Sequence, residues 1–270
     1  MAADSDIILV DVDERVAVVT LHRPEARNAL SRALLRAIRD TMAELDARHD
    51  VDVVVLTGAD PAFCAGLDLK ELGRDGGVLN DTPAPAADDG APRSVRARRA
   101  ILPIAKPVIG AVNGVAVTGG LELALNCDFL VASERARFAD THARIGVQPL
   151  WGLSVLLPEA VGLRRAREMS ATGNFVDAPT ALAWGLVNHV VPHDELLPVA
   201  TKLARDVTSS DQHALSTLLE TYRQGALLPG AEAWDLEGER AASFHGGTKV
   251  DASEIERRRS GVMDRGRAQL

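Results

Sequence analysis

The segment from Val51 to Thr57 constrains the fold of this chain more than any other. Its sequence, VDVVVLT, forms an almost unbroken apolar run that Gly58 closes. A strand that is apolar at successive positions, rather than at every second one, is typical of a sheet covered on both faces. Two shorter apolar runs, at 107–112 and 129–132, have the same character. Together these runs predict an α/β fold with a buried sheet.

Helical and strand patterns surround these runs. Residues 15–21 are β-branched and predict another strand. Ser31 predicts the N-cap of a helix to about Arg48. Its apolar side chains recur at three- and four-residue steps and predict one buried face: Leu34, Leu35, Ile38, Met42 and Leu45.

The second half of the chain has a different character. Beyond Trp151 we expect mostly helices, at 193–206, 211–225 and 229–244 among others, with one strand at 186–191. Strand–helix alternation followed by helices alone predicts two regions. These are an α/β core at residues 1–205 and a helical C-terminal region at residues 206–270.

Composition limits the classes of partner that this chain is expected to bind and the compartment in which it is expected to reside. A net charge of −8 argues against non-specific binding of nucleic acid. Two isolated cysteines, Cys64 and Cys127, favour a reducing, cytoplasmic location. No apolar run approaches the roughly 18 residues of a membrane-spanning helix, and the acidic N-terminus does not resemble a signal peptide. The histidines lack metal-ligand spacing, and neither a P-loop nor a dinucleotide-binding motif is present, so we expect no metal and no nucleotide cofactor.

Two consecutive segments differ from the rest of the chain, a predicted loop and a basic stretch that can be interpreted in two ways. Residues 74–92 are rich in Gly, Pro, Ala and Asp and predict a surface loop. The basic stretch at 93–102 predicts a helix whose arginines either form a solvated face or bind phosphate. Charge patterning favours the solvated face.

The first segment with chemical content follows the strand that ends at Thr57. It contains Ala65, Gly66, Leu67 and Asp68 in succession. Small residues at Ala65 and Gly66 let a ligand approach the backbone, so that a free N–H at Leu67 would face a carbonyl oxygen. The structural alternative, equally favoured by this segment alone, is a tight strand-to-helix turn that Asp68 caps.

The second segment couples a buried strand to a glycine-rich helix start, with Gly119 and Gly120 at the beginning of the helix. Helix N-termini carry unpaired N–H groups, so Gly119 supplies a second donor for a developing anion. Glu122 lies three residues on and projects from the same helical face. Alone, a glutamate in a first turn is explained more simply by the helix dipole.

In this order, the two segments resemble the crotonase, or enoyl-CoA hydratase/isomerase, superfamily. The motifs that carry the resemblance are FCAGLD, KPVIGAVNG and the GG-x-E helix, and LHRPEARNAL precedes them at 21–30. The resemblance covers about residues 7–205. It implies the crotonase fold, a spiral of ββα units that form two sheets, with a C-terminal helical region used in trimers or hexamers. It also implies an acyl-CoA thioester as substrate and no separate cofactor.

The resemblance assigns expected roles to individual residues. In this family two backbone N–H groups bind the thioester oxygen, at positions matched here by Leu67 and Gly119. The resemblance also places further residues along the cleft that binds the CoA thioester. Arg265 or Arg267 is expected to lie near a phosphate of this ligand. Trp151 and the run 153–157 line the acyl pocket or, more simply, belong to the core. The cleft residues are Arg27, Ala65, Gly66, Asp68 and Gly120.

The family's hydratases use two glutamates, and this chain departs from them at the second. The first matches Glu122, whereas His142 stands where the second glutamate is usual. We hypothesise that Glu122 orients or activates water and that His142 donates a proton with the help of Asp140, because a histidine exchanges protons near neutral pH. The alternative is that His142 only makes hydrogen bonds within a loop.

The function implied by the resemblance is that of a hydro-lyase. The enzyme would add water to a 2-enoyl-CoA and give a 3-hydroxyacyl-CoA, as in fatty-acid β-oxidation. Two alternatives remain open. A Δ3–Δ2 enoyl-CoA isomerase needs the same anion site and only one general base. A non-catalytic acyl-CoA-binding protein keeps the cleft and has lost one acid–base group.

Overall fold

The computed structural model describes residues 7–80, 101–226, 228–246, 259 and 263. The chain divides into two compact units, Met1–Gln212 and His213–Leu270, and each is described by itself. Most of the predicted basic stretch at 93–102, most of the loop predicted at 74–92, and both Arg265 and Arg267 lie outside the described residues. No helix in the described part of the chain combines the length and apolar character needed to cross a membrane.

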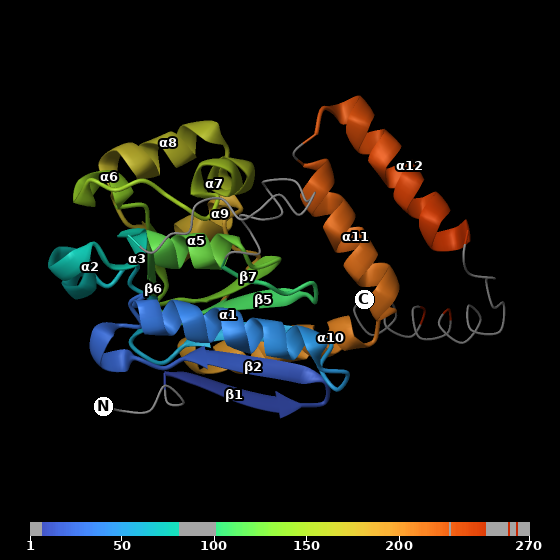
Figure 1. Cartoon of the computed structure of the whole chain (residues 1–270), viewed down its shortest axis with the longest axis horizontal. Helices are drawn as coiled ribbons and strands as arrows, with labels where there is room; N and C mark the ends of the chain where they lie inside the picture. The colour runs from blue at the N-terminus through green and yellow to red at the C-terminus, as the bar shows by residue number, and fades with distance from the viewer. Residues whose placement is uncertain (1–6, 81–100, 227, 247–258, 260–262, 264–270) are drawn as a thin grey trace. The chain divides into compact units, whose positions relative to one another are not determined.

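Two sheets build the first unit (Figure 1). In the larger sheet all neighbouring strands run parallel except the first pair. Its order is β1 (Ile8–Asp13), β2 (Val16–Leu21), β3 (Val53–Gly58), β5 (Val108–Val112), β7 (Phe129–Ser133) and β10 (His189–Val191). The smaller sheet has the order β4 (Ala62–Cys64), β6 (Val115–Val117), β8 (Arg137–Ala139) and β9 (Val176–Asp177).

Three successive ββα repeats join the sheets. In each repeat the first strand belongs to the larger sheet, the second strand belongs to the smaller sheet, and a helix follows. The repeats are β3–β4–α2, β5–β6–α5 and β7–β8–α6, with helices α2 (Leu69–Asp75), α5 (Gly119–Leu125) and α6 (His142–Ile145). The predicted arrangement of ββα units in two sheets is therefore confirmed.

The larger sheet is buried on both faces, as the apolar run around Val53 predicts. Val53 and Val55 of β3 pack with α10 (Leu196–Thr208), whereas Val54 and Leu56 belong to the core on the opposite face. Helix α1 (Arg32–Ala47) contributes to that second core. All six residues of β3 are buried, because successive side chains of a strand point to opposite faces.

Helix α1 follows its predicted pattern. The Leu34 N–H donates a hydrogen bond to the Ser31 side chain over 3.1 Å, so the predicted N-cap is confirmed. Its buried side chains are the five that the spacing predicts, namely Leu34, Leu35, Ile38, Met42 and Leu45. The helix is thereby capped at its start and packed into the core along its apolar face.

The remaining helices follow the two sheets and extend into the second unit. They are α3 (Gly77–Asn80), α7 (Leu153–Val161), α8 (Leu163–Thr172), α9 (Ala178–Trp184), α11 (Gln212–Gly225) and α12 (Gly230–Gly246). The strand predicted at 186–191 begins only at His189, because Leu186 and Val187 are buried in the turn that precedes it. The helix predicted at 193–206 begins at Leu196, after a short 3-10 turn.

Candidate active site

Each ββα repeat places a predicted catalytic residue at the start of its helix. Leu67 lies just before α2, Gly119 opens α5 and His142 opens α6. The preceding strands β4, β6 and β8 are parallel neighbours in the smaller sheet. Because parallel strands end at the same edge of a sheet, the three repeats bring these residues to one edge.

Glycine is required where the first two repeats meet. A Cβ atom on Gly66 would lie 2.7 Å from the Val117 carbonyl oxygen and 3.6 Å from the Gly119 nitrogen. Gly66 also has φ +88°, a conformation that other residues rarely adopt. A Cβ atom on Gly120 would overlap the Cys64 carbonyl oxygen. The start of α5 is therefore packed directly against the segment that leads to Leu67.

The Leu67 amide points away from Leu30, its partner in an isolated parallel bridge. The Leu30 N–H donates to the Gly66 oxygen over 2.7 Å, and the Asp68 N–H donates to the Leu30 oxygen over 3.1 Å. In a parallel bridge of this kind, the N–H of the intervening residue faces the opposite side. Among the described residues, neither the Leu67 N–H nor the Gly119 N–H donates a hydrogen bond to the protein. Both amides thus remain available to an external acceptor.

Glu122 is buried and its carboxylate is held in one orientation. Glu122 is only 1% exposed. Its Oε1 accepts hydrogen bonds from the Trp151 N–H over 2.6 Å and from the Leu150 N–H over 3.1 Å. Oε2 lies 3.3 Å from His142 Nε2. The glutamate therefore does more than complement the dipole of α5, since its second oxygen faces the third repeat.

His142 lies between two carboxylates. Its Nδ1 is 2.6 Å from Asp140 Oδ1, and its side chain is 5% exposed. Burial disfavours the charged imidazolium, but the hydrogen bonds and charges of Asp140 and Glu122 outweigh burial and raise the pKa of His142 to about 9. The ring is therefore protonated at neutral pH, with Glu122 on one nitrogen and Asp140 on the other.

Asp140 is adapted to this role. Burial opposes ionisation of its carboxyl group, but hydrogen bonds from His142 and Ser170 outweigh burial and place the pKa of Asp140 below its usual range. The backbone N–H of His142 also donates to Asp140 Oδ1 over 3.1 Å. The aspartate thus fixes both the ring and the first residue of α6.

Comparison with known proteins assigns the family. The model of the enoyl-CoA hydratase/isomerase family matches residues 11–254. The chain belongs to this family. It is 38% identical over 232 residues to the probable peroxisomal enoyl-CoA hydratase 1 of Arabidopsis thaliana, covering 86% of this chain and 84% of that protein.

Solved structures agree with this assignment. An enoyl-CoA hydratase from Mycobacterium tuberculosis H37Rv is 48% identical, with 87% of this chain and 98% of that chain covered and a TM-score of 0.71. An enoyl-CoA hydratase from Bacillus anthracis is 29% identical, with 94% and 96% covered and a TM-score of 0.80. The predicted membership of the crotonase superfamily and the crotonase fold are therefore confirmed.

The other residues expected along the cleft also make hydrogen bonds that stabilise the protein itself. The Ala65 N–H donates to the Arg27 carbonyl oxygen over 3.0 Å, which brings these two residues together. Asp68 caps α2 through hydrogen bonds from the Lys70 and Glu71 N–H groups, and its Oδ2 lies 3.1 Å from Arg23. The cap that the sequence offered as an alternative is thus present, and both Asp68 oxygens bind protein groups.

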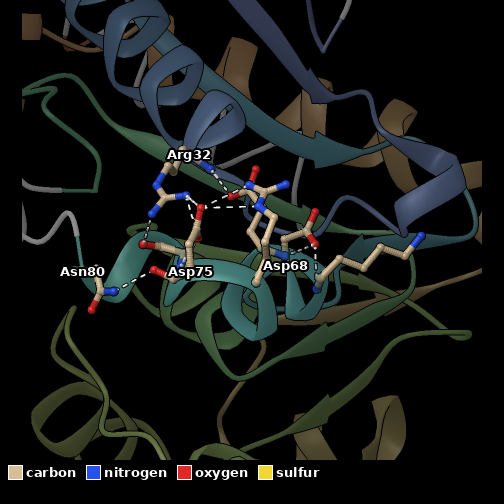
Figure 2. Close-up of polar contacts among 8 residues, drawn as sticks. Arg32, Asp68, Asp75 and Asn80 are labelled. Atoms are coloured by element: carbon tan, nitrogen blue, oxygen red, sulfur yellow. Dashed lines mark hydrogen bonds and ion pairs between the residues drawn. The ribbon is translucent and has the colours of Figure 1, made fainter.

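Helix α2 is fixed at its far end as well. Figure 2 shows Asp68 near its start and Asp75 at its end, beside Arg32 of α1. Arg32 Nη1 lies 2.9 Å from Asp75 Oδ1, and the Asn80 side chain donates to the Asp75 carbonyl oxygen over 2.6 Å. These contacts hold the helix that follows Leu67 against α1.

Trp151 contacts the site through its backbone and its ring. Its N–H holds Glu122, and its carbonyl oxygen accepts from Asn126 over 2.9 Å. A Cβ atom on Gly119 would lie 3.1 Å from Trp151 Cζ3 and 3.1 Å from Leu30 Cδ1. The ring is part of the core and also walls the start of α5.

Asn28 is a buried organising residue that the sequence analysis did not single out. It is fully buried. Its Oδ1 accepts from the Arg23 N–H over 2.8 Å, and its Nδ2 donates to the carbonyl oxygens of Ala59 and Ala62 over 2.8 and 2.7 Å. It ties the loop that contains Arg27 to the segment before Ala65. Its position within the family-like motif at 21–30 was the available signal.

Proposed function

We propose that this family member is an enoyl-CoA hydratase that adds water to a 2-enoyl-CoA and gives a 3-hydroxyacyl-CoA. The observation that carries the proposal is the pair of acid–base groups, Glu122 and His142, which face each other over 3.3 Å. Hydration requires one group to take a proton from water and another to protonate the α-carbon. Isomerisation requires only one general base, so the pair favours hydration.

The Leu67 and Gly119 amides supply the electrophilic part of the site. The thioester oxygen becomes enolate-like as water adds, and donors that are fixed in advance stabilise this charge as it forms. A single donor of this kind typically contributes about 2.7–4 kcal/mol to the transition state. The close packing of Gly66 and Gly120 holds the two segments in place before substrate binds.

The protonation states of Glu122 and His142 determine which group takes a proton and which group gives one. Glu122 takes a proton from water while the hydroxyl group bonds to C3, and the electrons of the double bond move toward the thioester oxygen. His142, protonated because two carboxylates surround it, gives its Nε2 proton to C2 as the enolate collapses. The proton on Glu122 then returns to Nε2 across the 3.3 Å contact, which restores both groups. Asp140 keeps Nδ1 protonated throughout.

Relatives that carry the name enoyl-CoA hydratase support this activity. The proposal extends to a role in fatty-acid β-oxidation, to a trimer or hexamer, and to a cytoplasmic location. The location rests on two isolated cysteines, both of which are buried, whereas the Arabidopsis relative is described as peroxisomal. Light scattering and cell fractionation test the assembly and the compartment.

The direct test of activity uses two substrates. The purified protein is mixed with crotonyl-CoA and, separately, with a 3-enoyl-CoA, and the absorbance of the conjugated enoyl thioester is followed. Loss of absorbance from crotonyl-CoA is expected. A gain of absorbance from the 3-enoyl-CoA without hydration would instead establish an isomerase.

Binding provides the third outcome. Butyryl-CoA, which has no double bond, serves as a matched ligand that binds without turnover. If calorimetry detects binding of both crotonyl-CoA and butyryl-CoA while neither enoyl substrate changes, the protein is a non-catalytic acyl-CoA binder and the proposal is wrong.

A further inference from the structure

Thr118 has a backbone conformation that its side chain opposes. It precedes Gly119 and has φ 54° and ψ −116°. A β-branched residue with positive φ is an outlier, and such a backbone conformation is strained. Glycine would adopt the same angles at little cost. The threonine side chain therefore makes a contribution that glycine does not.

The hydroxyl group of Thr118 has a specific partner in the next repeat. Its Oγ1 lies 2.5 Å from Thr141 Oγ1. Thr118 is 2% exposed and Thr141 is half-buried, so this contact is partly shielded from water. Its N–H also donates to the Ala139 oxygen over 3.0 Å. Two hydrogen bonds thus connect Thr118 to the segment that leads into α6.

Both threonines stand directly before a residue of the proposed site. Thr118 is the N-cap of α5 and precedes the Gly119 amide, and its carbonyl oxygen accepts from the Glu122 N–H over 3.0 Å. Thr141 is the N-cap of α6 and precedes His142. The hydroxyl contact consequently joins the anion-binding end of one repeat to the proton-donating end of the other.

We propose that Thr118 and Thr141 are positioning residues that hold the Gly119 amide and Glu122 in register with His142. The inference rests on the proposed function for its catalytic consequence. Neither hydroxyl reaches the reacting atoms in this assignment. Their hydrogen bond joins the N-caps of α5 and α6 and so sets the separation of the two helix starts that carry Glu122 and His142.

The test removes one hydroxyl without changing the shape of the side chain. Thr141→Val is compared with the matched control Thr141→Ser, which keeps the hydroxyl. Because displacement of a catalytic group by about 1 Å can cost 100-fold, we expect kcat to fall about 10- to 100-fold in the valine variant with KM nearly unchanged. The serine variant is expected to retain most of the activity.

A second variant guards against misfolding. Thr118→Gly removes the same hydrogen bond and is compatible with the positive φ, so it is expected to fold. Combined with Thr141→Val it should lower kcat no further than either change alone, because both remove one interaction. Fully additive losses, or full activity in both single variants, would overturn the proposal.

A readout without turnover separates this inference from the proposed function. The titration of the His142 ring is followed by nuclear magnetic resonance in the wild type and in Thr141→Val, since Glu122 and Asp140 face the ring from α5 and from the turn before α6. We expect the valine variant to titrate at lower pH. An unchanged titration rejects the positioning role even in an active enzyme, whereas a shifted titration in a protein that hydrates no enoyl-CoA rejects only the function.

Discussion

His142 and His193 both contact an aspartate through a ring nitrogen, yet their surroundings differ. His142 Nδ1 lies 2.6 Å from Asp140, and its other nitrogen faces Glu122. His193 Nε2 lies 3.0 Å from Asp60, and its other nitrogen lies 3.0 Å from the Ser133 hydroxyl. The side chain of Asp140 is 4% exposed, whereas that of Asp60 is 61% exposed.

The difference shows what distinguishes the proposed catalytic histidine from a structural one. The serine, histidine and aspartate around His193 have the composition of a hydrolase triad, but Ser133 is fully buried and accepts a hydrogen bond from the Arg135 N–H. Its hydroxyl is therefore withdrawn from any substrate. Around His142, by contrast, two buried carboxylates stabilise a charged ring. A contact with one aspartate is therefore not enough to indicate a proton-donating histidine. The second carboxylate, Glu122, distinguishes His142 from His193.

The largest effect is expected for Glu122→Gln. The new amide oxygen still accepts from the Trp151 and Leu150 N–H groups, so the fold is expected to persist. General-base catalysis is lost, and we expect the rate of crotonyl-CoA hydration to fall by about 10³-fold. A rate within tenfold of the wild type would contradict the assignment of Glu122 as the base.

Exchange of each histidine tests the comparison directly. His142→Gln is expected to lower kcat by about 100-fold, because the proton donor is lost. His193→Gln is the matched control, and its rate is expected to stay within about twofold of the wild type, because its ring contacts Ser133 and Asp60 and neither Glu122 nor Asp140. Both variants are assayed with crotonyl-CoA at saturation. Equal losses in the two variants would remove the distinction between the histidines.

Stability against pH gives a third contrast. The pKa of His142 is raised from 6.5 to about 9 in the folded protein, so its contribution is complete below pH 6.5 and disappears as the pH rises through 9. By linkage this corresponds to roughly 3 kcal/mol of the free energy of unfolding. Denaturant unfolding between pH 6 and pH 10 measures it.

The two histidine variants sharpen this measurement. The alkaline loss is expected to vanish in His142→Gln, because the titrating ring is absent, and to persist in His193→Gln. The activity of the wild type is also expected to decline as the pH rises through about 9, since the neutral ring has lost the proton that it donates. An alkaline loss of the same size in all three proteins would show that another group titrates.

Asp140→Asn is expected to have a smaller effect. The amide retains the shape of the side chain but removes a negative charge beside the ring, so the pKa of His142 should fall. We expect hydration at pH 7 to decrease about tenfold, with the alkaline decline displaced to lower pH. An unchanged pH profile would contradict the role of Asp140, and the profile of kcat/KM provides the measurement.

Much of the fold was predictable from local patterns. The helix after Ser31 and the buried run around Val53 were long enough for periodicity to identify them. The second strands of the repeats have only three residues each, as in Ala62–Cys64, and a run of that length shows no alternation. They form because the smaller sheet pairs them, which is a tertiary effect that no local pattern reveals.

The site was predictable in part. Motif order indicated that the segments around Leu67, Gly119 and Glu122 belong together, and Asp140 was expected to help His142. The contact between Glu122 and His142 depends on the turn at Leu150 and Trp151, which orients the carboxylate from 28 and 29 residues away. The Thr118–Thr141 hydrogen bond was missed because it requires a positive φ that threonine rarely adopts.

The smallest effect is expected for Asp60→Asn, the counterpart of Asp140→Asn. The new amide oxygen still accepts from Asn113 Nδ2, which lies 2.9 Å from the carboxylate. Hydrogen bonds from Asn113 and His193 outweigh partial burial and lower the pKa of Asp60, but its side chain is largely exposed, so solvent screens the charge. We expect stability to change by less than about 0.5 kcal/mol and hydration not at all. A loss of activity like that expected for Asp140→Asn would show that the exposure of the carboxylate does not distinguish the two histidine sites. Ser133, His193 and Asp60 would then need a functional explanation of their own.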